Sequence, residues 1–208
     1  MSDRVAVKIA IDLMHVPSQV RLFRSGPLPD GVPMLLRIAA GDDEAESTAA
    51  LLTDRSRDIV RQAATFFVEQ ILFAPNADSY RVLGAAPQAT AGELRRNVAL
   101  LLRWLHPDMD PRGERSIFIG RVTTAWNDLK TPERRAAYDD ELRNANEKIS
   151  FRFGGGKSRL GGNGAGTQLE NGAPNRSRLA SNARLTQRAD GIGFFRRALS
   201  VLFHRPPY

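Results

Sequence analysis

The stretch ALLLRWLHPDMDP, residues 99–111, places His106, Pro107 and Asp108 directly after a run of helix-forming residues. The residue before a proline is pushed out of helical geometry, so the helix is predicted to end at His106. The C-terminal end of a helix carries partial negative charge and disfavours an acidic side chain by about 0.3–1 kcal/mol. Local stability therefore gives no reason for Asp108, and its position indicates contact with another molecule.

Helical patterns flank this stretch on both sides and predict a compact helical unit over residues 75–145. SYRVLG, residues 79–84, is typical of a short helix ended by glycine, and TAGE, residues 90–93, is a capping box that opens the next helix. TPERRAAYDDEL, residues 131–142, begins a further helix with Thr131 as its N-cap. The predicted core of the unit consists of Tyr80, Leu83, Leu94, Val98, Leu101, Leu105, Ile119, Val122, Trp126 and Leu129.

Residues 1–74 form an N-terminal region that is predicted to be mostly helical from residue 33. VAVKIAIDL, residues 5–13, alternates as in a half-buried strand, although the same letters are compatible with a helix. VPMLLRIAA, residues 32–40, is a short helix candidate. A long helix is predicted over residues 42–73, and its apolar arc is too wide for a lone surface helix. The arc consists of two adjacent stripes, Ile59, Ala63, Phe66 and Phe73, and Val60, Ala64, Phe67 and Ile71.

The positive charge of the chain belongs to its C-terminal part. Residues 1–150 hold 20 Lys and Arg against 21 Asp and Glu, whereas residues 151–208 hold 10 against 2. Residues 146–190 are rich in Gly, Asn and Arg and are predicted to be a disordered linker. Residues 191–205 predict a short amphipathic helix that docks on a membrane surface or in a protein groove. Its apolar docking face contains Phe194, Phe195, Leu199, Leu202 and Phe203.

Several classes of function find no support in the residues. The chain has no cysteine, its three histidines show no metal-ligand spacing, and no catalytic constellation or cofactor motif is present. GGGKS, residues 154–158, lacks the earlier glycine that a phosphate-binding loop requires. The N-terminus does not read as a signal peptide, and no apolar run approaches the length of a membrane span. A cytoplasmic protein, with peripheral membrane association as an option, is the resulting expectation.

Residues 78–143 resemble the J-domain of the DnaJ-like co-chaperone family. The resemblance rests on SYRVLG for the first helix, TAGELRRNVALLLRWLHPD, residues 90–108, for the second, and AWNDLKTPERRAAYDDEL, residues 125–142, for the third and fourth. A bare His-Pro-Asp tripeptide occurs by chance in many chains. Here it is in register with all four helical patterns, which makes the resemblance specific. The expected fold is therefore mainly α.

The resemblance implies a site and a partner. The second and third helices would form an antiparallel hairpin whose tip presents His106, Pro107 and Asp108. The tip and the basic face of the second helix would dock on a DnaK-type heat-shock ATPase and stimulate its ATP hydrolysis. The protein would then be an activator and not itself an enzyme, because it biases a two-state partner through differential contacts. The basic residues on that helix are Arg95, Arg96 and Arg103.

The sequence also departs from the family pattern, and these departures leave a second function open. Ala99 and Leu100 stand where the family commonly has Lys or Arg, and Val98 replaces the usual tyrosine. Leu100 and Trp104 form an additional apolar stripe, which is interpreted as packing for the preceding helix rather than as a partner site. The alternative function is a non-stimulating scaffold or regulatory protein whose basic tail acts at a membrane surface. Nucleic acid is the less favoured target of that tail.

Overall fold

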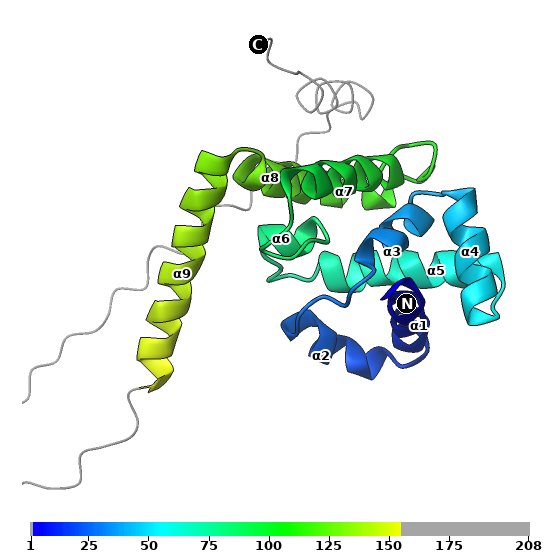
Figure 1. Ribbon diagram of the computed structural model, residues 1–208, viewed down its shortest axis with the longest axis horizontal. Helices are drawn as coiled ribbons and strands as arrows, with labels where there is room; N and C mark the ends of the chain where they lie inside the picture. Colours follow the sequence, from blue (N-terminus) through cyan, green and yellow to red (C-terminus); the bar gives the residue numbers. More distant parts are fainter. Residues whose placement is uncertain (1, 155–208) are drawn as a thin grey trace, which may run out of the picture.

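The computed structural model describes residues 2–154, and within that range the regular structure is entirely helical (Figure 1). The mainly α fold class is thereby confirmed. The predicted amphipathic helix over 191–205 and most of the predicted linker lie outside the described residues. The α-helices in chain order are α1 Ser2–His15, α2 Val20–Ser25, α3 Val32–Ala39, α4 Asp43–Thr53, α5 Arg57–Phe67, α6 Ser79–Val82, α7 Ala91–Trp104, α8 Ile119–Leu129 and α9 Pro132–Gly154.

The first five helices form an N-terminal bundle built around α5. α1, α3 and α4 all pack on α5, and the side chains that line it, among them Val60 and Phe67, are fully buried. A helix packed from three directions needs a wide apolar arc, so the prediction that this helix is buried on more than one side is confirmed. A π-helical turn, Val68–Leu72, continues α5 toward the second half of the molecule.

The strand predicted within residues 5–13 is wrong, because these residues lie in α1. Val7 and Ile11 are buried together with Ala6 and Ala10, whereas Val5 is 54% exposed. The buried positions recur every three to four residues, which is the helical period. A run in which alanine separates larger apolar residues fits both a period of two and a period of 3.6, and the contact with α5 selects the helix.

The continuous helix predicted over 42–73 is also wrong, because the chain turns between α4 and α5. Asp54 ends α4 in the left-handed conformation, at φ +54°, and Ser56 caps α5 by accepting a hydrogen bond from the Ile59 amide. Asp is one of the few residues with a side chain that enter the left-handed region readily. The turn lets α4 fold back on α5 instead of extending away from the bundle.

Glu46 is buried inside this bundle and carries an ion-pair network between α4 and α5. Its carboxylate, 1% exposed, accepts from Arg61 at 2.6 Å and from Arg57 at 3.0 Å. The hydrogen bonds from Arg61, followed by those from Arg57, hold the pKa of the Glu46 carboxyl below its usual value of 4.5. A lowered pKa stabilises the fold above that value, and the contribution is lost as the pH falls through the folded-state pKa.

We expect Glu46→Gln to lower the free energy of unfolding at pH 7 by about 1–3 kcal/mol. This loss is smaller than the loss expected on breaking a fully buried ion pair, because both arginines reach water. Urea unfolding at pH 7 and at acidic pH checks this. The difference in unfolding free energy between the wild type and the variant should become smaller at acidic pH, because the Glu46 carboxyl is then protonated in the wild type. An equal difference at both pH values would contradict the ion-pair explanation.

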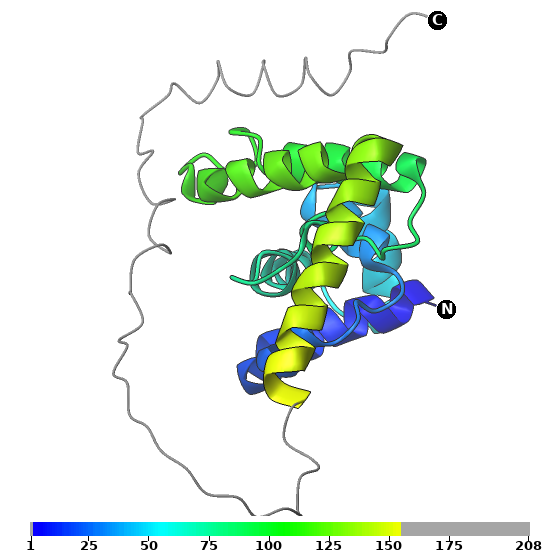
Figure 2. The ribbon, with the colours of Figure 1, turned by 90° about the vertical axis from the view of Figure 1, so that its left-hand side faces the viewer.

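The remaining helices, α6 to α9, form the second helical unit. The predicted capping box is present, since Thr90 accepts from the Glu93 amide and the Glu93 carboxylate accepts from the Thr90 amide. α7 and α8 pack side by side, and α9 follows α8 at a steep angle and leads away from its end (Figure 1 and Figure 2). All ten residues of the predicted core are buried. α9 continues past residue 145 to Gly154, so the first part of the predicted linker is helical.

The two units pack on each other along α7. α3 lies against α7, and the Phe73 ring stacks on Trp104 and on Phe118 at centroid distances of 5.8 and 4.6 Å. The predicted packing of the N-terminal region on the second unit is therefore present at Trp104. The contact is made by Phe73, one residue of the predicted apolar arc, whereas the helix that runs along α7 is α3 and not α5.

Candidate functional site

The chain makes a tight turn directly after α7, and this turn presents the His-Pro-Asp tripeptide. The amides of Met109 and Asp110 both donate to the His106 carbonyl oxygen, at 2.8 and 3.1 Å. Pro107 has no amide hydrogen to satisfy, and it is exposed. The Asp108 side chain is 87% exposed. The turn therefore directs a carboxylate into solvent at the end of α7, where the fold itself makes little use of it.

His106 and Asp108 contact each other within the turn. The Asp108 amide lies 3.2 Å from His106 Nδ1, and an Asp108 carboxylate oxygen lies 3.3 Å from the same nitrogen. One ring nitrogen cannot accept and donate a hydrogen bond at once, so in a given tautomer at most one of the two contacts is a hydrogen bond. In the tautomer that carries its proton on Nε2, Nδ1 accepts from the Asp108 amide, which stiffens the turn and leaves the carboxylate as an acceptor for other groups.

Asp110 and Arg115 hold the turn from the inside, and sequence reasoning did not single out either. Asp110 is 9% exposed and its carboxylate accepts from the Arg115 amide at 2.7 Å. The Arg115 guanidinium donates to the Met109 carbonyl oxygen at 3.3 Å and lies 4.7 Å from the centre of the Trp104 ring. Arg115 lies in a short 3₁₀-helix, Glu114–Phe118, between α7 and α8, and no apolar periodicity in the sequence marks such a role.

The N-terminal bundle reaches the same turn. The Arg115 Nε lies 3.6 Å from a carboxylate oxygen of Glu69, a residue of the π-helical turn. Burial raises the pKa of the Glu69 carboxyl, against the lowering effect of Arg115. On the other side, a Cβ added at Gly41 would lie 2.8 Å from the Met109 Cε, so the Met109 side chain packs directly on this glycine.

The three predicted basic residues of α7 are exposed but not equivalent. Arg95 and Arg96 lie on the outer face of the helix. Arg103 donates to the Gly41 carbonyl oxygen at 3.3 Å and is thus engaged with the N-terminal bundle. Val98 is buried and Leu100 is half-buried, whereas Ala99 is exposed. Arg103 keeps its positive charge near the turn, but its guanidinium is held by the N-terminal bundle, unlike those of Arg95 and Arg96, for which no such bond is seen among the described residues.

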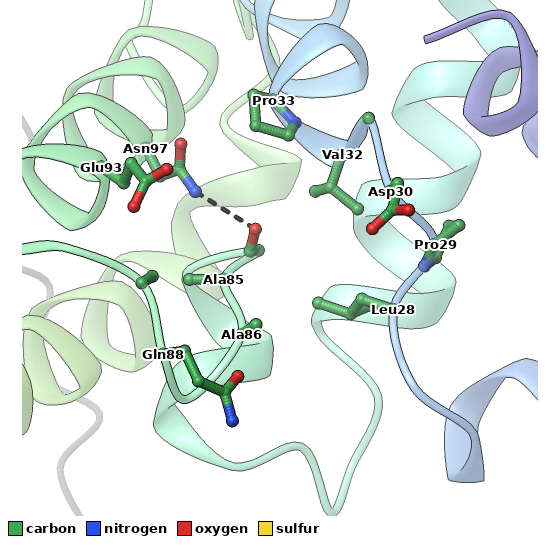
Figure 3. A pocket seen from close by; sticks show the side chains of 13 residues that line it. Leu28, Pro29, Asp30, Val32, Pro33, Ala85, Ala86, Gln88, Glu93 and Asn97 are labelled. Carbon is green, nitrogen blue, oxygen red and sulfur yellow. Dashed lines mark hydrogen bonds between the residues drawn. The ribbon is translucent and has the colours of Figure 1, made fainter. Parts of the chain in front are cut away.

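A separate cavity of about 350 Å³ lies between the N-terminal bundle and the second unit (Figure 3). Val32 and Ala85 contribute apolar lining, and the Asn97 amide nitrogen donates to the carbonyl oxygens of Leu83 and Gly84 at 2.9 and 3.1 Å. Glu93 and Asp30 stand on different sides of it. Glu93 precedes His106 by nearly the whole of α7, which is about 20 Å along the helix, so the cavity and the turn are different features.

Within residues 2–154 no group of acidic or histidine side chains is arranged to hold a metal ion, and no helix is both long and apolar enough to cross a membrane. The features that converge on the surface are instead the exposed turn and the outer face of α7. α7, the turn and α8 therefore form a helical hairpin with a polar tip.

The model of the DnaJ domain family matches residues 78–139. The chaperone protein DnaJ of Leifsonia xyli is 40% identical over 63 residues, which cover 30% of this chain and 17% of that protein. The chaperone protein DnaJ of Hydrogenobacter thermophilus is 32% identical over 74 residues, covering 36% and 21%. A protein named curved DNA-binding protein from Coxiella burnetii is 36% identical over 62 residues, covering 30% and 20%.

Residues 78–139 are therefore a segment of the J-domain family. The chain spans about a fifth of the length of these relatives. No solved structure matches the chain. The N-terminal bundle, residues 2–74, lies outside the matched family segment.

Proposed function

We propose that this protein is a co-chaperone that docks on a DnaK-type heat-shock ATPase and stimulates its ATP hydrolysis. The docking surface consists of the turn at His106, Pro107 and Asp108 together with Arg95 and Arg96 on the outer face of α7. The observation that carries the proposal is the 87% exposed Asp108 carboxylate at the C-terminal end of a helix, within a segment of the J-domain family. The DnaJ relatives, which are named as chaperone proteins, support it.

The chemistry of the turn fits such a role. A carboxylate accepts hydrogen bonds and pairs well with an arginine or with backbone amides of a partner. The hydrogen bonds to the His106 carbonyl oxygen order the turn before binding, which reduces the entropy lost on docking. A partner that has two conformations shifts toward the one that these contacts favour, and faster hydrolysis follows if that conformation is the active one.

Single-turnover ATP hydrolysis by a purified DnaK-type ATPase from the same organism tests the proposal. The hydrolysis rate should rise and then saturate as the full-length protein is added. A rate that stays constant at saturating protein, with binding still detectable, would exclude stimulation.

We expect Arg95→Ala and Arg96→Ala to weaken docking in a salt-dependent way. Charges on an exposed face mainly steer association, so the concentration for half-maximal stimulation should rise about 3- to 10-fold at low salt. The difference from wild type should narrow near 1 M salt, where the screening length falls to about 3 Å. Arg4→Ala, an exposed arginine on α1, is the matched control. A loss that is the same at low and high salt would contradict the steering role.

The second candidate function is a non-stimulating scaffold that acts through its basic tail. The observation that favours it is that the N-terminal bundle occupies part of the surface of α7. α3 packs along this helix, and Arg103 donates to the Gly41 carbonyl oxygen, so less of α7 is open to an ATPase. In that case the ATPase rate would not change, while the full chain would bind anionic vesicles and a chain ending at residue 154 would not. Binding of duplex DNA in place of vesicles would assign the tail to nucleic acid.

A further inference from the structure

Arg115 joins the His-Pro-Asp turn to both halves of the molecule. Its amide donates to the Asp110 carboxylate, and its guanidinium donates to the Met109 carbonyl oxygen. These two residues are the ones whose amides close the turn on His106. The Arg115 side chain therefore binds the backbone at Met109, directly after Asp108, while its main-chain amide binds the Asp110 carboxylate.

The guanidinium of Arg115 is itself held on two further sides. It lies over the Trp104 ring at the end of α7, and the Glu69 carboxylate lies 3.6 Å from its Nε. Arg115 is 24% exposed and Glu69 is 33% exposed, so water screens this pair less than a surface pair. Glu69 comes from the N-terminal bundle, outside the J-domain segment.

The position of Glu69 depends on an irregularity of the fold. Glu69 lies in the π-helical turn Val68–Leu72, and the widened turn is followed directly by Phe73, which stacks on Trp104 and Phe118. π-helical turns are rare and occur frequently at functional sites. Here the π-helical turn brings the Glu69 carboxylate and the Phe73 ring next to the residues that support the His-Pro-Asp turn.

We propose that Arg115 and Glu69 are positioning residues of the docking turn. Arg115 holds residues 108–110 in the conformation that docks, and Glu69 fixes the Arg115 guanidinium from the N-terminal bundle. The N-terminal bundle is thus a part of the docking device rather than an independent appendage. The expected effect of Arg115 and Glu69 on the ATPase rests on the proposed function. Their expected effect on the conformation of the turn does not depend on any partner.

A positioning role has a defined kinetic signature. If the turn is in the docking conformation for only a fraction of the time, the apparent dissociation constant rises by the inverse of that fraction. Once docked, the turn makes the same contacts, so the stimulated rate at saturation does not change. A residue that touches the ATPase at the stimulated step would instead lower that saturated rate.

Hydrogen exchange in the full-length protein tests the effect on the turn. Arg115→Met should speed exchange at the Met109 and Asp110 amides roughly tenfold, and Glu69→Gln roughly threefold, because each variant removes part of the support of the turn. Exchange in α8 should stay at the wild-type rate. Arg112→Ala is the matched control, since Arg112 belongs to the same connection between α7 and α8 and its side chain is 87% exposed.

Titration of the same variants into the single-turnover assay tests the effect on docking. The concentration for half-maximal stimulation should rise by the same factors as the exchange rates, with an unchanged rate at saturation. Unchanged exchange at Met109 and Asp110 in Arg115→Met would overturn the proposal, as would an equal acceleration throughout α7 and α8. A lower saturated rate would overturn it as well. If the wild-type protein stimulates no ATPase, the proposed function fails, and hydrogen exchange alone decides whether Arg115 and Glu69 position the turn.

Discussion

Asp108→Asn is expected to abolish stimulation of the DnaK-type ATPase while leaving the fold intact. The amide keeps the shape of the side chain but loses the charge that roughly doubles the strength of its hydrogen bonds to a partner. The folded protein barely uses that charge, because the side chain is 87% exposed and lies at the helix end where negative charge is disfavoured. Stability should change by a few tenths of a kcal/mol at most, and in the direction of greater stability.

Single-turnover hydrolysis and thermal unfolding, measured on the same preparations, check this prediction. Asp140→Asn is the matched control, because Asp140 is an exposed carboxylate on α9 that pairs with Arg143 at 2.9 Å, away from the turn. The control should stimulate like the wild type. If Asp108→Asn stimulated the ATPase as strongly as the control, the charge of Asp108 would not be needed for stimulation, which would contradict the proposed role of the turn. A large drop in melting temperature would instead show that Asp108 has a structural role.

Trp104→Ala is expected to be the most destabilising single change at the contact between the two units. The Trp104 side chain is 1% exposed and lies among Phe73, Phe118 and the Arg115 guanidinium. Removing a buried tryptophan costs the transfer free energy of the ring and leaves a cavity, about 3–5 kcal/mol in total. The loss should appear in the unfolding of the whole described structure, since the ring is shared by both units.

Urea unfolding of Trp104→Ala and Trp104→Phe separates packing from hydrogen bonding. The indole nitrogen of Trp104 is buried and has no hydrogen-bond partner within the described residues. Phenylalanine keeps the stacking and removes this unsatisfied group, so it should cost less than about 1.5 kcal/mol. Leu51→Ala, an 86% exposed leucine on α4, should cost little. A cost below about 1 kcal/mol for Trp104→Ala would show that the two units are stable without their shared aromatic contact.

The second unit was predictable because its signals are local. The capping box at Thr90 and Glu93, the proline that starts α9 and the stop before Pro107 are all interactions between residues close in the chain. Such interactions depend little on what packs against them, so the sequence pattern and the structure agree. The burial of all ten predicted core residues follows from the same helical periodicity.

The N-terminal bundle was less predictable because its patterns are ambiguous. Residues 5–13 fit both a strand and a helix, and the turn at Asp54 rests on one residue in a left-handed conformation. In both cases the packing on α5 selects among backbone conformations that the local residues allow about equally. Tertiary packing overrides local preference most easily where that preference is weak.

By itself the sequence determined the four helices of the J-domain segment, their core and the position of His106, Pro107 and Asp108 between the second and third. The tertiary structure alone decided what supports that turn. Gly41 packs on Met109, Arg115 donates to Met109 and Asp110, and the Glu69 carboxylate lies beside the Arg115 guanidinium. Glu69 and Gly41 are far from this turn in the chain and come from the N-terminal bundle, which packs on α7 through α3. A support made of long-range contacts has no local signal, because its residues acquire their roles from packing and not from their neighbours in sequence.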